Sequence, residues 1–451
     1  MNAPGAEVDP AQRKVIATLV VTQAFGGIGV ATGLSVSSLL AAEIVDNETL
    51  SGLPQTSQVV GAALMAIVLA RIMDVRGRRP GLAVGYLAAM IGALLCVVSA
   101  VVESFPVLIT GALLMGAATA VNNQSRYAAT DLASPSRRAR ALSVVVWATT
   151  LGAVLGPNLV GVAGRAAQGV GLPELSGPFV LGFFGLASAT AVMAVFLRPD
   201  PLLLARERAG LVAVGSTGSG PTEARGRGVA PAPGVATRRT RDVWKVLAAR
   251  PQALAAVVAM AAAHTVMVSV MVMTPLHMHH GGAELDIIGF VISMHILGMF
   301  AFSPLVGWLT DRVGRPAVLV LGAVTLVASV LLAGSTSAGA SSQLTVGLFL
   351  LGLGWSFALI ASSALLVDAV PLAERPAAQG ASDLVMGLAA AAGGALAGVV
   401  VDVWGYDLLN IGAGALAVVV LGAAFVARGS HGGGVGLEPA GVAAEPSGSP
   451  D

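Results

Sequence analysis

The chain has 451 residues, of which 55% are hydrophobic and only 11% are charged, and its mean hydropathy is +0.83. This composition excludes an ordinary soluble globular protein, and a net charge of +1 gives no reason to expect a nucleic-acid partner. The single cysteine, Cys96, excludes a disulfide framework and a CxxC metal or redox motif.

The N-terminus is polar and acidic before the first apolar run. It lacks the basic start and the cleavage site of a signal peptide, so we expect the first span to be retained. Twelve apolar segments follow, at 15–41, 55–73, 81–102, 107–128, 141–165, 178–197, 252–275, 286–309, 317–335, 344–367, 380–401 and 407–427. A helix needs about 20 apolar residues to cross a bilayer. The pattern predicts an all-α membrane protein with twelve transmembrane helices.

The basic residues set the predicted orientation in the membrane. With both termini in the cytoplasm, 24 of the 25 Lys and Arg residues fall in cytoplasmic segments or in the cytoplasmic halves of helices, and only Arg165 lies outside. Positive residues favour the cytoplasmic side. We therefore expect a multi-pass protein of the cytoplasmic (inner) membrane of a bacterium, embedded in the lipid bilayer and monomeric.

The chain is predicted to divide into five units. They are a cytoplasmic tail at 1–14, a six-helix bundle at 15–198, a flexible cytoplasmic linker at 199–250, a second six-helix bundle at 251–428 and a disordered tail at 429–451. The linker is too rich in Gly, Pro, Ala, Thr and Arg to bury a core. Its end, from Asp242 to Arg250, is expected to form a short amphipathic helix on the membrane surface. With no Walker A sequence and no catalytic constellation, we expect neither an ATPase nor an enzyme.

The two halves repeat each other. Four loop positions recur at one ungapped offset of 237 residues: Asp74 at Asp311, Arg78 at Arg315, Asp131 at Asp368 and Arg138 at Arg375. One offset shared by several polar positions indicates a duplicated six-helix unit. Both copies enter from the same side, so the repeat is parallel and its pseudo-axis follows the membrane normal.

The loop GWLTDRVGR at 307–315 and its weaker partner ARIMDVRGRR at 70–79 resemble the cytoplasmic loop signature of the major facilitator superfamily (MFS). The first copy has Ala70 where that family prefers Gly. The resemblance implies two six-helix bundles that rock around a central site and give alternating access. It also implies that the loop charges act as latches between helices: Asp74, Arg78, Asp311 and Arg315. Alternatively, these charges only fix the topology, and the two roles are compatible.

Seven of the 14 methionines and five of the six histidines lie between Met260 and Met299, on the seventh and eighth predicted spans. Four of these side chains share one narrow stripe of span seven at 100° per residue: Met260, His264, Met267 and Met271. On span eight, His295 and Met299 are one turn apart on a single face. The two spans run in opposite directions, so we expect Met267 and His295 at the same depth, near the membrane midplane.

A second cluster, His277-Met278-His279-His280, follows at the outer end of span seven in a predicted loop. Thioether and imidazole groups suit a soft metal such as Cu(I), so the cluster is a candidate for metal capture at the extracytoplasmic mouth. The alternative is that methionines fill gaps in apolar helices and that loop histidines carry no ligand.

The motif Met267-xxx-Met271, followed 28 residues later by His295-xxx-Met299, resembles the signature of the CcoA-like copper importers, a branch of the MFS. The resemblance implies that these four residues handle copper. Copper would then be the substrate, and no permanently bound cofactor is expected.

Two further membrane segments carry charge. Span four ends in a polar run at 122–127, where Arg126 is expected either to pair with an acid or to extend to the cytoplasmic interface. Asp383, just inside span eleven, is the best candidate for a proton-titrating carboxylate, although an acid near a helix start also favours the helix dipole. Gly156-Pro157 in span five partly resembles an antiporter motif, and a Pro-kinked packing site is the favoured alternative.

Two hypotheses of function follow from these patterns. In the first, the protein is a secondary transporter that imports copper by alternating access. In the second, it is a proton-coupled transporter, often an exporter, of a small organic compound or drug, and the methionine stripe is a soft apolar wall for that cargo. A transporter-like sensor that moves nothing is the third alternative. Copper accumulation and drug susceptibility in complemented cells distinguish the first two.

Overall fold

The computed structural model describes residues 9–45, 50–210, 240–336 and 341–429. Within these ranges the chain is helical and contains no β-strand. The predicted all-α class is therefore confirmed.

The N-terminal bundle consists of six long helices and two short 3-10 turns. They are α1 (Pro10–Val45), α2 (Leu53–Arg76), α3 (Arg78–Val102), α4 (Phe105–Ala128), η2 (Pro135–Arg137), α5 (Arg138–Gly169), η3 (Glu174–Ser176) and α6 (Gly177–Phe196). Proline occupies the first turn of α2, α4 and α6, where its missing N–H costs no helical hydrogen bond.

The C-terminal bundle has the same number of crossings. Its helices are α9 (Pro251–His280), α10 (Leu285–Phe300), α11 (Ser303–Val313), α12 (Arg315–Gly334), α13 (Ser341–Ala369) and α14 (Arg375–Gly429). In the described part of the chain, eleven segments are long and apolar enough to cross a membrane, with α10 and α11 forming one of them. A sharp turn at Gly405 (φ 89°) divides α14 into two crossings, which brings the total to twelve.

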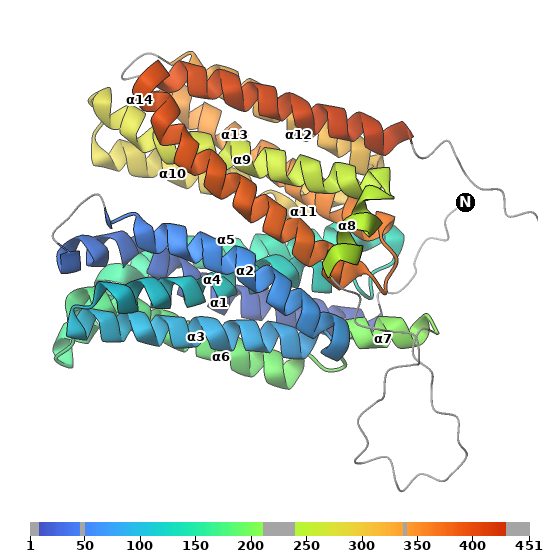
Figure 1. The fold of residues 1–451 in the computed structure, drawn as a ribbon, viewed down its shortest axis with the longest axis horizontal. Coiled ribbons are helices and arrows are strands. Elements are labelled where there is room, and N and C mark those ends of the chain that lie inside the picture. Colours follow the sequence, from blue (N-terminus) through green and yellow to red (C-terminus); the bar gives the residue numbers. More distant parts are fainter. Residues whose placement is uncertain (1–8, 46–49, 211–239, 337–340, 430–451) are drawn as a thin grey trace, which may run out of the picture.

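The two bundles form two layers, blue to green and yellow to red in Figure 1. They meet mainly where α2 packs on α14 and where α5 packs on α11. Small residues permit this close approach, since a Cβ added to Gly307 would lie 2.1 Å from Ser143 Oγ, and one added to Gly380 would lie 2.5 Å from the Ala70 Cβ. The two bundles are thus in direct helix-to-helix contact at these two glycines.

Two short helices lie in the segment predicted as a linker. They are α7 (Pro201–Arg208) and α8 (Thr240–Ala248), and both lie at the same end of the bundles. In α8, Leu247 is buried whereas Trp244 is exposed, which gives the helix two unlike faces. Residues 211–239 and the predicted tail at 430–451 lie outside the described residues. We refer to this side of the molecule, predicted to be cytoplasmic, as the α7–α8 end.

Tight turns connect α2 to α3 and α11 to α12 at the α7–α8 end. Each turn has a glycine with positive φ, Gly77 at 91° and Gly314 at 101°. Residues with a Cβ rarely adopt this conformation, so the glycine in each copy of the repeated loop is a backbone requirement.

A candidate functional site at the interface of the two bundles

A buried ion pair joins the two bundles. Arg126 of α4 and Asp383 of α14 approach to 2.7 Å between Nη2 and Oδ1, and their side chains are 3% and 2% exposed. A charge buried in an apolar interior is costly unless it is paired and hydrogen-bonded. Of the two arrangements expected for Arg126, the structure has the pairing with an acid.

The surroundings of Arg126 are polar and come from both bundles. Its guanidinium donates to Asn123 Oδ1 at 3.0 Å and contacts Met260 Sδ of α9 at 3.7 Å, while its buried Nε has no hydrogen-bond partner. The hydroxyls of Tyr127 and Ser382 also point to the Met260 sulfur, at 3.8 and 3.5 Å. Met260 therefore belongs to this site, with its sulfur acting as a hydrogen-bond acceptor.

A chain of hydrogen bonds continues from Asp383 toward the α7–α8 end. Gln124 donates from Nε2 to Asp383 Oδ2 at 2.7 Å, and its Oε1 accepts from Arg78 Nη1 at 3.3 Å. Arg78 pairs with Asp131 at 2.8 and 3.2 Å, and it also donates to Gln379 Oε1 at 2.7 Å. The side chains of Arg78 and Asp131 are fully buried. We call the Arg78–Asp131 pair the first latch.

The second copy of the repeat forms a matching pair in a different environment. Arg315 and Asp368, which we call the second latch, approach to 2.9 Å, and their side chains are 14% and 30% exposed. Asp368 also pairs with Arg138 of the other bundle at 2.5 Å, and Arg315 donates to the Pro135 carbonyl at 2.7 Å. The second latch therefore joins the bundles at the edge of the molecule.

The two remaining loop acids, Asp74 and Asp311, have unlike partners. Asp311 accepts from the backbone N–H groups of Ala139 and Arg140 at 3.1 and 3.0 Å, so it caps the start of α5 across the bundle interface. Asp74 instead accepts from Arg206 of α7 at 2.7 Å. The sequence predicts equivalent latch roles for these acids, and the geometry gives them different ones.

Helix α7 connects both bundles through one side chain. Arg206 donates to the Asp74 side chain and carbonyl, each at 2.7 Å, and to the Ala373 carbonyl of the other bundle at 3.4 Å. The sequence interpretation missed Arg206 because it treated 199–250 as a linker. The signal was Asp200-Pro201, since Asp at the N-cap and Pro at the first position are typical of a helix start.

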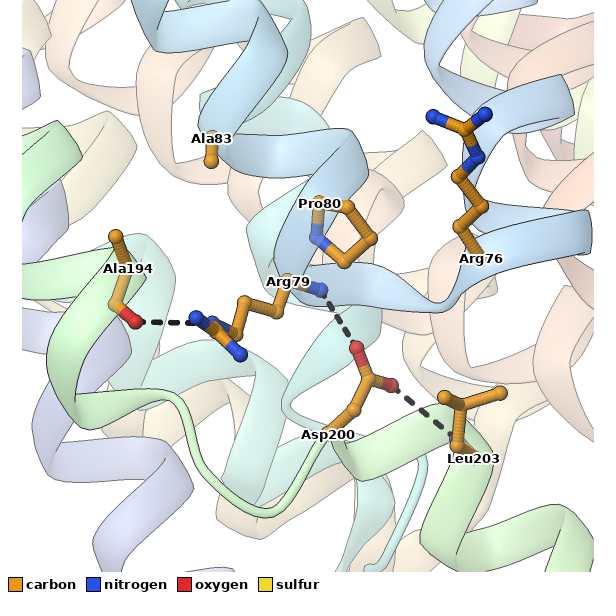
Figure 2. Close-up of a pocket in the computed structure, with 7 residues that line it drawn as sticks. All are labelled: Arg76, Arg79, Pro80, Ala83, Ala194, Asp200 and Leu203. Atoms are coloured by element: carbon orange, nitrogen blue, oxygen red, sulfur yellow. Dashed lines mark hydrogen bonds between the residues drawn. The ribbon is translucent and has the colours of Figure 1, made fainter. Parts of the chain in front are cut away.

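Asp200 fixes α7 to the N-terminal bundle. It accepts from Leu202 N and Leu203 N at 3.0 and 3.2 Å, and from Arg79 N at 2.7 Å, while Arg79 Nε donates to the Ala194 carbonyl at 2.9 Å (Figure 2). A pocket of about 360 Å³ lies here, lined by Arg76, Arg79, Pro80, Ala83, Ala194, Asp200 and Leu203. None of these residues takes part in the Arg126–Asp383 site.

The span-seven stripe is only partly in contact with that site. His264 is half-buried, and its Nδ1 accepts from Trp355 Nε1 of α13 at 2.8 Å. Met267 is buried and Met271 is half-buried in the core of the C-terminal bundle. Of the four predicted stripe residues, Met260 alone makes a hydrogen-bond contact with the other bundle among the described residues.

The span-eight motif faces α13. His295 is fully buried, its Nδ1 lies 2.9 Å from the Leu348 carbonyl, and its buried Nε2 has no hydrogen-bond partner. A Cβ added to Gly352 of α13 would lie 2.8 Å from the Met299 nitrogen, so this face of α10 packs tightly on α13. Helix α10 contacts α9 only slightly, and α13 packs against both helices.

The helix that carries His295 and Met299 thus packs mainly on α13, and only slightly on α9, which carries Met267 and Met271. Among the described residues, no three His, Cys, Asp or Glu side chains gather closely enough to hold a metal ion. Copper handling by Met267, Met271, His295 and Met299 stays a prediction.

The sequence predicts that the outer cluster lies in a loop. This prediction is wrong, because α9 continues to His280. His277 stacks on the Tyr406 ring at 4.2 Å, and its Nε2 lies 3.4 Å from Thr336 Oγ1. Met278 is buried. The side chains of His279 and His280 lie outside the described part of the structure.

Comparison with known proteins gives one consistent family. The sequence profile of the Major Facilitator Superfamily matches residues 16–285 and 267–441. An uncharacterized MFS-type transporter, YddS of Bacillus subtilis (strain 168), is 35% identical over 415 residues, which cover 91% of this chain and 89% of YddS. The riboflavin transporter RfnT of Brucella anthropi is 27% identical over 407 residues, which cover 89% of this chain and 92% of RfnT.

Solved structures share the fold. The human organic anion transporter MFSD10 (TETRAN) has a TM-score of 0.69 at 18% identity, covering 93% of this chain and 100% of that one. The MFS transporter FucP in its outward conformation has a TM-score of 0.61 at 16% identity, covering 92% of this chain and 98% of FucP. At these identities the likeness concerns the fold alone.

Proposed function

The chain belongs to the Major Facilitator Superfamily, and from this premise we propose that it is a proton-coupled secondary transporter of a small organic compound. The family implies alternating access between two bundles. The observation that carries the proposal is the buried Arg126–Asp383 pair, which crosses the bundle interface. Ionisable residues inside a membrane are costly, and they commonly mark proton relays and substrate pathways.

The pair supplies a physical link between proton binding and bundle contact. When Asp383 is charged, it attracts Arg126 of the opposite bundle and holds the two bundles together. A proton on Asp383 removes that attraction and leaves Arg126 as a buried cation without a counter-charge. Loss of one partner of a buried pair is strongly unfavourable, so the protonated state favours separation of the bundles at this level.

The described conformation is closed toward the cytoplasm in this proposal. Polar contacts between the bundles gather at the α7–α8 end, where Asp311 caps α5 and where Arg138 pairs with Asp368. In Figure 1 the two layers converge toward the same end. Export or import depends on which state the substrate enters, and both directions use the same closure.

Copper import is the second candidate, and one observation favours it. The Nδ1 of His295 is fixed by the Leu348 carbonyl, and the Nε2 is left without a partner. Metal-binding histidines are commonly oriented in this way by their second nitrogen. Against this candidate, the Met260 sulfur is already used as an acceptor by its neighbours, and α10 packs on α13 rather than on α9.

Proteoliposomes with an internal pH-sensitive dye distinguish the two functions. We expect organic compounds, with riboflavin tested first because RfnT is named for it, to trigger proton movement by the wild type. Asp383→Asn should abolish that signal, and the same substitution at an exposed position of the same helix, Asp402→Asn, should preserve it. If no organic compound moves protons while ⁶⁴Cu uptake depends on His295, the copper function replaces the one proposed.

A further inference from the structure

We propose that Gln124 is a positioning residue that connects the buried Arg126–Asp383 pair to the first latch, so that loss of the Asp383 charge loosens the bundle contact at the α7–α8 end. This inference rests on the proposed coupling role of Asp383 and adds the route by which that role reaches the surface. Gln124 lies outside the repeated loop motif, and its contact with Arg78 connects that motif to the buried pair.

The geometry of the Gln124 amide carries the first step. Its nitrogen donates to Asp383 Oδ2 at 2.7 Å, and its oxygen accepts from Arg78 Nη1 at 3.3 Å. An amide has donors at one end and an acceptor at the other, so each end fixes the orientation of the other. The bond to a charged carboxylate is roughly twice as strong as a neutral one. When Asp383 loses its charge, the amide loses the interaction that aims its oxygen at Arg78.

Arg78 carries the second step, because it is itself a contact between the bundles. It pairs with Asp131 of its own bundle at 2.8 Å and donates to Gln379 of α14 at 2.7 Å. Gln379 precedes Asp383 by one helical turn on α14, so the two cross-bundle contacts of α14 lie side by side. A change in the orientation of Gln124 therefore acts on an arginine that holds both bundles.

The duplication shows that the latch does not require this connection. The 237-residue offset places Ala361 and Ser363 at the positions of Gln124 and Arg126, and Leu142 and Val146 at the positions of Gln379 and Asp383. The second latch nevertheless forms, at 2.9 Å between Arg315 and Asp368. The network therefore occurs once and has no counterpart at the positions that the offset relates to it, which fits a coupling role rather than a requirement of the fold. Its four residues are Gln124, Arg126, Gln379 and Asp383.

Other charged groups near Asp383 do not replace Gln124. Among the described residues, Arg126 and Tyr127 face it from α4 and Arg78 acts from α3, while His264 of α9 lies beyond Arg126. Among the described residues, no hydrogen bond joins Asp383 to Arg78 directly. The hydrogen-bonded connection between the ion pair and the first latch therefore passes through the Gln124 side chain.

The test measures opening at the bundle interface without any knowledge of the substrate. The only cysteine, Cys96, is first removed by the substitution Cys96→Ala. Ser143→Cys then introduces a single thiol beside Gly307, where α5 and α11 meet. Ser143 is fully buried, so a maleimide reaches the thiol only when the bundles separate. Alkylation rates are measured on the full chain in nanodiscs and divided by the rates in denaturant.

We expect Gln124→Leu to raise the alkylation rate about tenfold, the size expected for one lost hydrogen bond to a charged group. Asp383→Asn should raise the rate further, because it also removes the counter-charge of Arg126. The double variant should match Asp383→Asn alone, because the connection through Gln124 is already broken in that variant. A double-variant rate about tenfold above that of Asp383→Asn would show that Gln124 acts independently and would overturn the proposal.

Two controls keep the result interpretable. Gln58→Leu, a buried glutamine of α2 outside this network, should leave the rate within about twofold. Gln124→Met, which preserves the length of the side chain, serves if the leucine variant does not fold. If Asp383→Asn alone leaves the rate unchanged, the proposed coupling role of Asp383 fails, which is distinct from failure of Gln124 alone.

Discussion

The two latches come from one duplicated motif, yet they lie in opposite environments. Arg78 and Asp131 are fully buried and connected to Gln124 and Gln379, whereas Arg315 and Asp368 are partly exposed and connected to Arg138. The same pair of residue types is thus an interior network in one copy and an aqueous-edge contact in the other. The motif specifies a pairing, and its surroundings decide what the pairing does.

The largest expected difference comes from removing one acid in each copy. Asp131→Asn leaves Arg78 as a buried charge without a counter-ion, which should cost about 3–5 kcal/mol of stability. Asp368→Asn removes a 30% exposed partner from two partly exposed arginines and should cost less, about 1 kcal/mol. Thermal unfolding of both variants in the same detergent measures the contrast. Equal shifts in Tm would show that burial does not separate the two latches.

The turn glycines give the second comparison. Both have φ near 90–100°, so Gly77→Ala and Gly314→Ala should each cost about 1–3 kcal/mol in backbone strain. At Gly77 the added methyl would also lie 2.6 Å from the Asp200 carboxylate, while nothing lies within 4 Å at Gly314. We therefore expect the larger drop in Tm for Gly77→Ala. An equal or larger drop for Gly314→Ala would contradict the geometry at Asp200.

Arg206 sharpens the comparison because, in the part of the chain that the structure describes, a helix of the α7 kind lies beside the first copy alone. Arg206→Ala removes hydrogen bonds to Asp74 and to the Ala373 carbonyl and should cost about 1–3 kcal/mol. It should also raise the maleimide accessibility of a cysteine at Ser143, because a contact between the bundles is lost. A variant with unchanged accessibility would show that α7 stabilises the N-terminal bundle alone.

Arg208 of the same helix should have the smallest effect. Its hydrogen bond to Asp9 lowers the pKa of that exposed carboxyl below its ordinary value of 3.8. A lowered acid pKa stabilises the fold above the ordinary pKa, and the contribution disappears as the pH falls through the lowered value. Arg208→Ala should therefore reduce Tm slightly at pH 7 and not at all well below pH 3.8. A pH-independent shift would mean that packing, not charge, is lost.

Hydropathy and the repeated loop were enough to predict the twelve crossings and the fold class, because a bilayer imposes length and composition on each helix. Helical phase correctly predicts that His295 and Met299 share a face of one helix. It does not reveal which neighbouring helix meets that face, and here the neighbour is α13. The sequence predicts the cluster at 277–280 in a loop because the seventh apolar segment ends at 275, yet α9 extends through the cluster.

The site itself depends on contacts that no local pattern contains. Arg126 and Asp383 were identified as separate candidates, and their pairing joins positions 257 residues apart. Gln124 meets Asp383 across 259 residues, and Arg206 meets Asp74 across 132. Sequence periodicity predicts where a polar side chain is unusual, and tertiary packing alone decides its partner.

The anchoring of α7 bears on whether its contacts need a continuous chain. Its contacts are complete by Arg208, so a polypeptide ending at Gly210 keeps the entire helix on the N-terminal half. If a second polypeptide began before α8, the hydrogen bond from Arg206 to the Ala373 carbonyl would become a contact between two chains. We therefore expect the contacts of α7 with both halves to survive a break in the chain between Gly210 and Thr240.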